Sequence, residues 1–278
     1  MSIRLLDLLR SKPVFSMLAL KLFLVPSLIW LISLASRRWG PGIAGWLSGF
    51  PIVSAPVLFF LAIDQGPQFS AEAAVATLSA VFAVFVFSLA YAWTATRAGW
   101  LASVSAGLLG YFSLVTLLSR LAPPLWVSAP LVYAMVALAP RLFPSMQAMR
   151  KTPMFSRAEI VSRMAAGAVL VLALTYFARD LGPRWSGLLA MFPVLGTVLA
   201  VFSHRQAGAP FTINLLRGMT IGYYAFSTFC LVLALVLPDM SVAAAFTLAL
   251  GAAALIQVFA RRLVTVQTPT GIGRFPHR

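Results

Sequence analysis

The chain consists of long apolar runs separated by short stretches rich in glycine, proline and arginine. Runs such as VFSMLALKLFLVPSLIWLISLA (14–35) and AVATLSAVFAVFVFSLAYAW (74–93) reach the roughly 20 residues that a helix needs to cross about 30 Å of hydrocarbon. No alternating pattern of a membrane barrel is present, and a backbone in lipid must satisfy its own hydrogen bonds. We therefore expect an all-α polytopic membrane protein.

The pattern predicts nine membrane-spanning helices. We expect the first apolar run to be a retained helix, because it is longer than the core of a signal peptide and no small-residue cleavage site follows it. Glycine, proline and charged residues set the limits of the spans. These limits are about 14–36, 41–63, 71–95, 98–120, 125–143, 159–178, 183–203, 211–237 and 241–260.

The second and seventh spans resemble each other. GPGIAGWLSGFP (40–51) and GPRWSGLLAMFP (182–193) share glycine and proline positions, and Gly66 and Phe69 match Gly208 and Phe211 in the same register. Glycine and proline dictate backbone geometry, so these matches indicate a shared backbone conformation and not only shared hydrophobicity. The matches within the two stretches are Gly40/Gly182, Pro41/Pro183, Gly45/Gly187, Leu47/Leu189, Phe50/Phe192 and Pro51/Pro193. The alternative is a chance alignment of two apolar helices.

This register predicts two four-helix repeats joined by a linker helix. Residues 1–143 would hold the first repeat and the linker, and 144–278 the second repeat and a short basic C-terminal tail. Four helices plus one linker make an odd number, so the second copy enters the membrane from the opposite side. Inverted repeats of this kind are common in secondary transporters.

A proline falls near the midpoint of each matching span. Proline inside a helix costs about 3 kcal/mol, and a broken helix at mid-membrane is tolerated only where protein or a water-filled cavity covers it. The half-helix that follows would direct its positive end toward that cavity, which suits an anionic group. The alternative is that each proline only kinks its helix. The candidate substrate-binding residues are Phe50, Pro51, Ser54, Phe192, Pro193 and Thr197.

Two G-x-x-x-G patterns occur, at Gly45/Gly49 and at Gly218/Gly222. Glycines at this spacing let two membrane helices approach closely. We therefore interpret them as packing positions.

Few ionisable residues fall within the spans, where they are costly and often functional. Lys21 and Arg217 lie near span ends, from which their side chains can snorkel to the interface. Asp64 is the preferred candidate for proton coupling, although a hydrated loop acid is the plainer interpretation. His204 beside Arg205 fits an ordinary surface histidine. The last polar candidates are Tyr223 and Tyr224, whose hydroxyls we expect to face a neighbouring helix rather than a cavity.

Composition agrees with a membrane protein, since 61% of residues are hydrophobic and 10% are charged. The net charge of +15 does not indicate nucleic-acid binding, because the arginines lie between apolar runs. Placing the N-terminus outside and the C-terminus inside puts most of the basic residues in cytoplasmic loops. The basic first twelve residues oppose that orientation. Cys230, the single cysteine, lies inside an apolar run and offers no disulfide within the chain.

Enzyme motifs are not found. The chain contains no H-E-x-x-H, G-x-S-x-G or G-x-x-x-x-G-K sequence, and its two histidines and six acids do not suggest a metal cage or a catalytic carboxylate pair. We therefore expect no catalytic residue, no metal and no cofactor.

The segment 186–235 resembles the GlpM-type small bacterial inner-membrane proteins. The shared pattern is Gly187, Phe192-Pro193, Gly208 and Gly218-Met219; the first half of the chain supplies Gly45, Phe50-Pro51 and Gly66 but lacks the later Gly-Met pair. The resemblance implies a fused duplication of such a four-helix protein in a bacterial inner membrane. That family is linked to envelope polysaccharide production, and no catalytic residue is carried over.

Two functions follow from these patterns. The first is a transporter of a small solute, with an anion as one option, whose site lies between the two proline-broken helices. The second is a non-transporting scaffold or accessory subunit for envelope biosynthesis. In either case we expect the protein to contact the lipid bilayer and to bind no nucleic acid. An oligomer is compatible with both functions.

Overall fold

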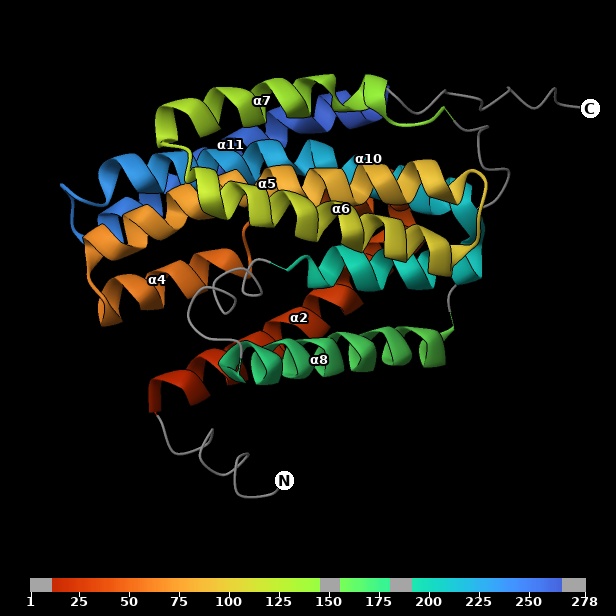
Figure 1. Cartoon of the computed structure of the whole chain (residues 1–278), viewed down its shortest axis with the longest axis horizontal. Coiled ribbons are helices and arrows are strands. Elements are labelled where there is room, and N and C mark those ends of the chain that lie inside the picture. Colours follow the sequence, from red (N-terminus) through yellow and green to blue (C-terminus); the bar gives the residue numbers. More distant parts are fainter. Residues whose placement is uncertain (1–11, 146–155, 181–191, 267–278) are drawn as a thin grey trace, which may run out of the picture.

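A computed structural model describes residues 12–145, 156–180 and 192–266, and all regular structure in these ranges is helical (Figure 1). The helices are α2 (Lys12–Trp39), α3 (Pro41–Ser48), α4 (Ser54–Asp64), α5 (Pro67–Ala95), α6 (Trp100–Leu121), α7 (Leu125–Leu142), α8 (Arg157–Asp180), α10 (Val194–Val236) and α11 (Val242–Val266). The predicted seventh span begins in 183–191, which lies outside the described residues.

Seven of the described helices are long and apolar enough to cross a membrane. The two short helices, α3 and α4, are separated by a break at residues 49–53. Large apolar side chains such as Trp126, Leu109 and Val258 are exposed on α7, α6 and α11, where lipid would cover them. The protein is therefore a multi-pass helical membrane protein.

Helix α10 is longer than one crossing. Its 43 residues would extend about 65 Å as a straight helix, twice the hydrocarbon thickness. It contains one non-helical residue, Gly208, with φ 81° and ψ 175°. Gly208 divides α10 into a first segment, 194–207, and a second segment, 209–236. The two segments lie beside each other and point in opposite directions (Figure 1).

A second glycine has nearly the same conformation. Gly66 precedes α5 with φ 95° and ψ 160°, a region that disfavours residues with a side chain. Pro67 then occupies the first turn of α5, where its missing N–H has no helical partner to lose. The helix consequently begins four residues before the predicted start of the third span at 71.

Helix α4 and the first segment of α10 leave the middle of the molecule in opposite directions. In Figure 1, α4 runs from the middle to the left-hand end and returns as α5, whereas the first segment of α10 runs from the middle to the right-hand end and returns as the second segment. Helices α2 and α8 likewise run antiparallel, as do α6 and α11. We call the ends at Gly66 and at Gly208 the Gly66 end and the Gly208 end.

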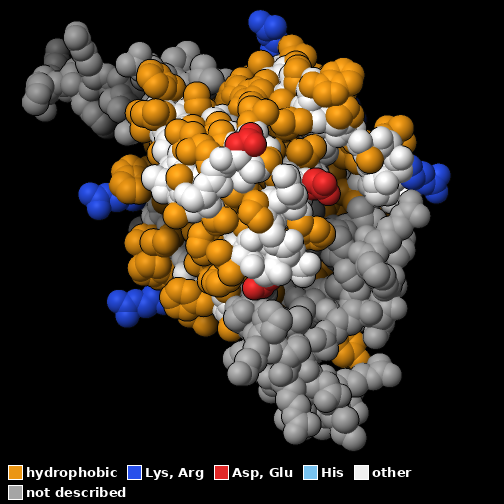
Figure 2. All heavy atoms as spheres, turned by 90° about the vertical axis from the view of Figure 1, so that its left-hand side faces the viewer, with side chains coloured by type: hydrophobic (Ala, Val, Ile, Leu, Met, Phe, Trp, Pro, Cys, Tyr) orange, Lys and Arg blue, Asp and Glu red, His pale blue; other side chains and the backbone are white. Residues whose placement is uncertain are grey.

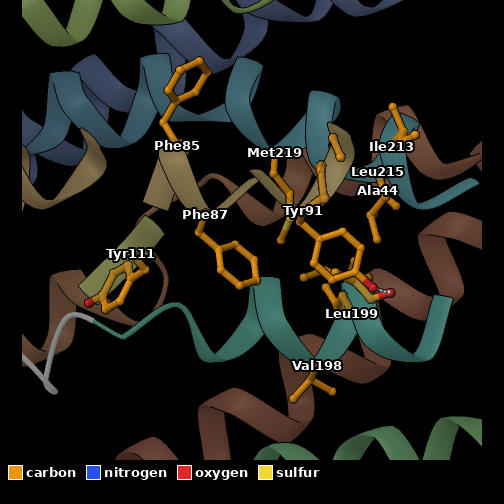
Figure 3. Packing of buried hydrophobic residues seen from close by; sticks show 14 of the residues in the cluster. Ala44, Phe85, Phe87, Tyr91, Tyr111, Val198, Leu199, Ile213, Leu215 and Met219 are labelled. Atoms are coloured by element: carbon orange, nitrogen blue, oxygen red, sulfur yellow. Dashed lines mark hydrogen bonds between the residues drawn. The ribbon is translucent and has the colours of Figure 1, made fainter. Parts of the chain in front are cut away.

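The core is formed where α5 meets both segments of α10. Phe87 and Tyr91 of α5 are fully buried against Leu199 of the first segment and Leu215 of the second (Figure 3). The Tyr91 hydroxyl lies 3.2 Å from the carbonyl oxygen of Ala200, to which it donates. These contacts fix the start of the first segment against the centre of the molecule.

Helix α3 crosses the second segment of α10 at backbone contact. A Cβ atom at Gly45 would lie 2.7 Å from the amide nitrogen of Met219, and one at Gly222 would lie 2.8 Å from the Cα of Gly49. The two G-x-x-x-G patterns therefore pack against each other, which confirms their interpretation as close-approach positions. This crossing holds the break after α3 against the middle of α10.

A hydrogen bond joins α7 to this central helix. The Tyr133 hydroxyl lies 2.7 Å from the Thr228 hydroxyl of the second segment. In a double-mutant cycle with Tyr133→Phe and Thr228→Val, we expect a coupling energy of about 0.6 kcal/mol, the average for side-chain hydrogen bonds between membrane helices. Thermal or denaturant unfolding of the four proteins measures it. A coupling energy of zero would contradict the bond.

Candidate functional site

The chain between α3 and α4 turns around Pro51. The amide of Ile52 donates to the carbonyl of Phe50 at 2.8 Å, and the amide of Ala55 donates to the carbonyl of Pro51 at 2.9 Å. The first bond spans two residues and defines a γ-turn centred on the proline. Proline suits this centre because it has no N–H to leave unpaired. The predicted break in the second span is confirmed.

The chain before α10 makes the same turn around Pro193. Val194 donates to Phe192 at 2.8 Å and Thr197 donates to Pro193 at 2.9 Å. Pro193 has φ −78° and ψ 67°, the values of an inverse γ-turn. The two turns therefore have the same hydrogen bonds at the same sequence spacing, and helix α10 begins immediately after the proline as predicted. The predicted half-helix before Pro193 lies outside the described residues.

The helix limits keep that spacing along the chain. Adding 142 to the numbers of Pro51, Gly66 and Phe69 gives Pro193, Gly208 and Phe211. The same offset brings α2 onto α8, α4 onto the first segment of α10, α5 onto the second segment and α6 onto α11, to within a few residues. Helix α7 has no counterpart among the described helices, and α3 would correspond to 183–190, which lies outside the described residues.

A cavity of about 310 Å³ lies between the two proline turns. This volume is at the lower limit for sites that bind small organic molecules. Its wall is formed by α2, the 48–54 break, α5, α8, the start of α10 and the middle of the second segment of α10. The cavity therefore lies among the elements that the offset relates.

Four of the predicted site residues line the cavity, namely Phe50, Ser54, Phe192 and Pro193. Pro51 is buried behind them at the turn. Thr197 does not line the cavity, and its buried hydroxyl has no hydrogen-bond partner among the described residues. Asp64 is exposed at the last residue of α4, outside the cavity lining.

Several lining residues were not predicted as site residues. Lys21 of α2 lines the cavity, whereas the sequence favoured snorkelling. Thr175 of α8 also lines it, as does Tyr223 of α10, which we expected to face a neighbour. Tyr224 does face one, since its ring centroid lies 6.2 Å from that of Tyr133. Lys21 lies one helix turn from Val25, which also lines the cavity, but nothing in the sequence marks either residue as part of a site.

Two hydroxyl groups of the lining already donate hydrogen bonds within their own helices. Ser48 donates to the carbonyl of Gly45 at 2.6 Å, and Thr175 donates to that of Val171 at 2.8 Å. Each thus turns only acceptor lone pairs toward the cavity. Most of the remaining wall is apolar, with Phe50, Phe192 and Phe226 among its residues. Across the described residues, no three His, Cys, Asp or Glu side chains gather as metal ligands would.

The two ends of the molecule are packed differently. At the Gly208 end, Arg163 of α8 is 1% exposed and donates to the Gln206 side chain at 2.5 Å. Ile160 and Phe211 pack beside them, with Phe211 fully buried. At the Gly66 end, Phe69 is 50% exposed. Phe211 is therefore buried at one end of the molecule, whereas Phe69, its counterpart at the offset of 142, is exposed at the other.

No protein-family model, curated protein or solved structure matches this chain.

Proposed function

We propose that the protein is a membrane transporter of a small solute, built from two inverted four-helix repeats. The observation that carries the proposal is the pair of proline γ-turns with equal hydrogen bonds, both contributing residues to one cavity. Broken helices that meet at a cavity are typical of the midplane sites of secondary transporters. The substrate would bind beside Phe50, Ser54, Phe192 and Pro193.

The repeat accounts for the number of crossings that we propose. The seven long helices count α10 once and omit α3 and α4. Treating α3 with α4 as one crossing and the two segments of α10 as two gives nine (7 + 1 + 1). The first repeat and the linker helix α7 then fall within 1–143, and the second repeat within 144–278. The constant offset of 142 and the opposite directions of the paired helices support this division.

Charge supports an outside N-terminus. Acidic residues lie at the Gly66 end, where Asp64 ends α4 and Glu72 follows in α5. Figure 2 faces this end and shows acidic side chains on the face, with basic side chains at its rim. Arginines at the Gly208 end include Arg97, Arg157 and Arg205. Lysine and arginine accumulate in cytoplasmic loops, so the Gly208 end would face the cytoplasm.

The unequal packing of the two ends supports alternating access. At the Gly208 end Arg163 is hydrogen-bonded to Gln206 and Phe211 is buried, whereas Asp64 and Phe69, the counterparts of Gln206 and Phe211, are exposed at the Gly66 end. The Gly208 end would then be the closed end. An inverted repeat reaches its opposite state when the two halves exchange these conformations. The described conformation would be open toward the Gly66 end.

The remaining expectations from the sequence accompany this proposal. We propose a bacterial inner membrane as its location, a fused duplication of a GlpM-type protein as its origin, and no enzymatic activity. Asp64 stays the candidate coupling residue. Its exposure leaves it open to solvent at the end that we propose to be open.

Reconstitution into proteoliposomes tests the transport function. Uptake of a panel of labelled metabolites would be measured for wild type, Pro51→Ala and Pro193→Ala. Alanine restores an N–H and permits a continuous helix, so we expect either variant to lower flux about tenfold, the effect of about 1.4 kcal/mol. Pro130→Ala is the control, because Pro130 lies inside the uninterrupted α7.

Two outcomes would count against the proposal. Unchanged flux in both variants would remove the broken-helix site. Absence of flux for every solute would favour the scaffold instead, in which the prolines only shape the helices.

A further inference from the structure

Among the residues that the structure describes, Lys21 is the only charged one that lines the cavity between the two proline turns. It lies in α2, three residues inside the span that begins at Leu18. Its side chain faces the cavity together with Val25, one helix turn further on. A lysine ammonium has three donors and no acceptor, and it needs a counter-charge or water when it lies at membrane depth.

The repeat explains why this ammonium is available. Its counterpart at the offset of 142 is Arg163, which is buried and hydrogen-bonded to Gln206. Gln206 in turn corresponds to Asp64, which is exposed rather than paired with Lys21. None of the described carboxylate side chains forms an ion pair with Lys21. At the open end the ammonium of Lys21 therefore faces the cavity, whereas at the closed end the guanidinium of Arg163 is hydrogen-bonded to Gln206.

The cavity adds two weaker sources of positive potential. Helix α4 begins at Ser54 and α10 begins at Val194, and both residues line the cavity. The first amides of a helix lack intrahelical partners and carry a partial positive charge. The Ser54 hydroxyl lies within the same lining. A negative group beside Lys21 would thus meet the ammonium and the ends of two helices.

The rest of the wall restricts what the anion can be. Its apolar side chains include Phe50, Phe192 and Phe226. An inorganic anion would lose its hydration there without replacement by enough donors. An organic anion could direct its acidic group to Lys21 and its apolar body to the aromatic side chains.

From this arrangement we propose that the solute is an organic anion with an apolar body, and that the Lys21 ammonium binds its acidic group. This inference rests on the proposed transport site. It adds the chemical class of the solute and assigns to Lys21 a role that differs from snorkelling.

Binding of simple aromatic acids tests the assignment. The full-length protein in phosphatidylcholine nanodiscs would be titrated with benzoate, benzenesulfonate and phenylphosphonate, with neutral benzamide and cationic benzylamine as shape-matched controls. Thermal unfolding reports binding, because a ligand that binds only the folded state raises its melting temperature. We expect at least one acid to raise the melting temperature of wild type, and neither control compound to do so.

Variants identify the group responsible. Lys21→Gln should weaken binding of that acid about tenfold or more, as the loss of a charged hydrogen bond does, and Lys21→Arg should retain most of it. Arg120→Gln is the matched control, since it removes one exposed charge at the same end of the molecule. It should bind like wild type. Equal binding by Lys21→Gln and wild type, a shift with benzamide equal to that with the acids, or no shift with any acid would overturn the proposal.

The failure of this inference can be told apart from the failure of transport. Flux of neutral or cationic metabolites, combined with no response to the acids, would leave the transporter standing and reject the anion. Binding of an acid that depends on Lys21, without flux of any metabolite, would support the anion site and reject transport. If phosphatidylglycerol in the nanodisc abolished the shift through competition, the occupant would be a lipid headgroup and the proposal would fall.

Discussion

Replacing Gly222 with leucine is expected to prevent the protein from reaching its folded state. A Cβ atom at Gly222 would lie 2.5 Å from the carbonyl oxygen of Trp46 and 2.8 Å from the Cα of Gly49. Both are backbone atoms, so no change of side-chain rotamer relieves the clash. Overpacking usually costs about 1–3 kcal/mol, and this case belongs at or above the upper end of that range.

Size-exclusion chromatography and thermal unfolding in detergent measure this effect. The control is Gly251→Leu on α11, because a Cβ at Gly251 meets no atom within 4 Å. We expect Gly251→Leu to elute and unfold like wild type, and Gly222→Leu to aggregate or unfold at a much lower temperature. Wild-type behaviour of Gly222→Leu would mean that α3 does not cross α10 at this point.

The second large effect concerns the Gly208 end of the molecule. Phe211 is fully buried beside Ile160, and Phe69, its counterpart at the offset of 142, is 50% exposed. Truncation of a buried phenylalanine to alanine costs about 3–5 kcal/mol. Phe211→Ala should therefore lower the free energy of unfolding by about 3 kcal/mol, while Phe69→Ala should change it by less than about 1 kcal/mol.

Chemical or thermal unfolding of the two variants gives the comparison. The pair controls for residue type and for position within the repeat, so a difference reports only the unequal packing of the two ends. Similar losses for both variants would show that the two ends are packed alike in the population that unfolds.

Much of the fold could be predicted from the sequence because lipid imposes few solutions. Apolar runs of fixed length located α2, α6, α7 and α8 to within three residues, and the start of α11 to within one. The break at Pro51 and the start of α10 after Pro193 were also predicted, because the glycines and prolines around them dictate backbone conformation. A proline within an apolar run does not by itself predict a break in the helix. Pro26 and Pro130 lie inside continuous helices, where neighbouring turns accommodate them.

The features that could not be predicted depend on packing between distant segments. No local pattern shows that Lys21 faces a cavity rather than lipid, since its side chain is long enough for either. The burial of Arg163 likewise depends on Gln206, which is 43 residues away in the sequence. Thr197 is a similar case. Its place one turn after Pro193 predicted a position at the cavity, but the orientation of α10, which depends on packing, directs it elsewhere.

The central claim is that the two halves of the chain cross the membrane in opposite senses. Single cysteines introduced at Gln65, next to Gly66, and at Arg205, three residues before Gly208, test it directly. Both positions are exposed, and the native Cys230 is fully buried, so a membrane-impermeant maleimide should label only the introduced cysteine. In intact cells and inside-out vesicles, inverted repeats predict that the two cysteines are labelled from opposite sides of the membrane. Labelling of both from the same side would contradict the account.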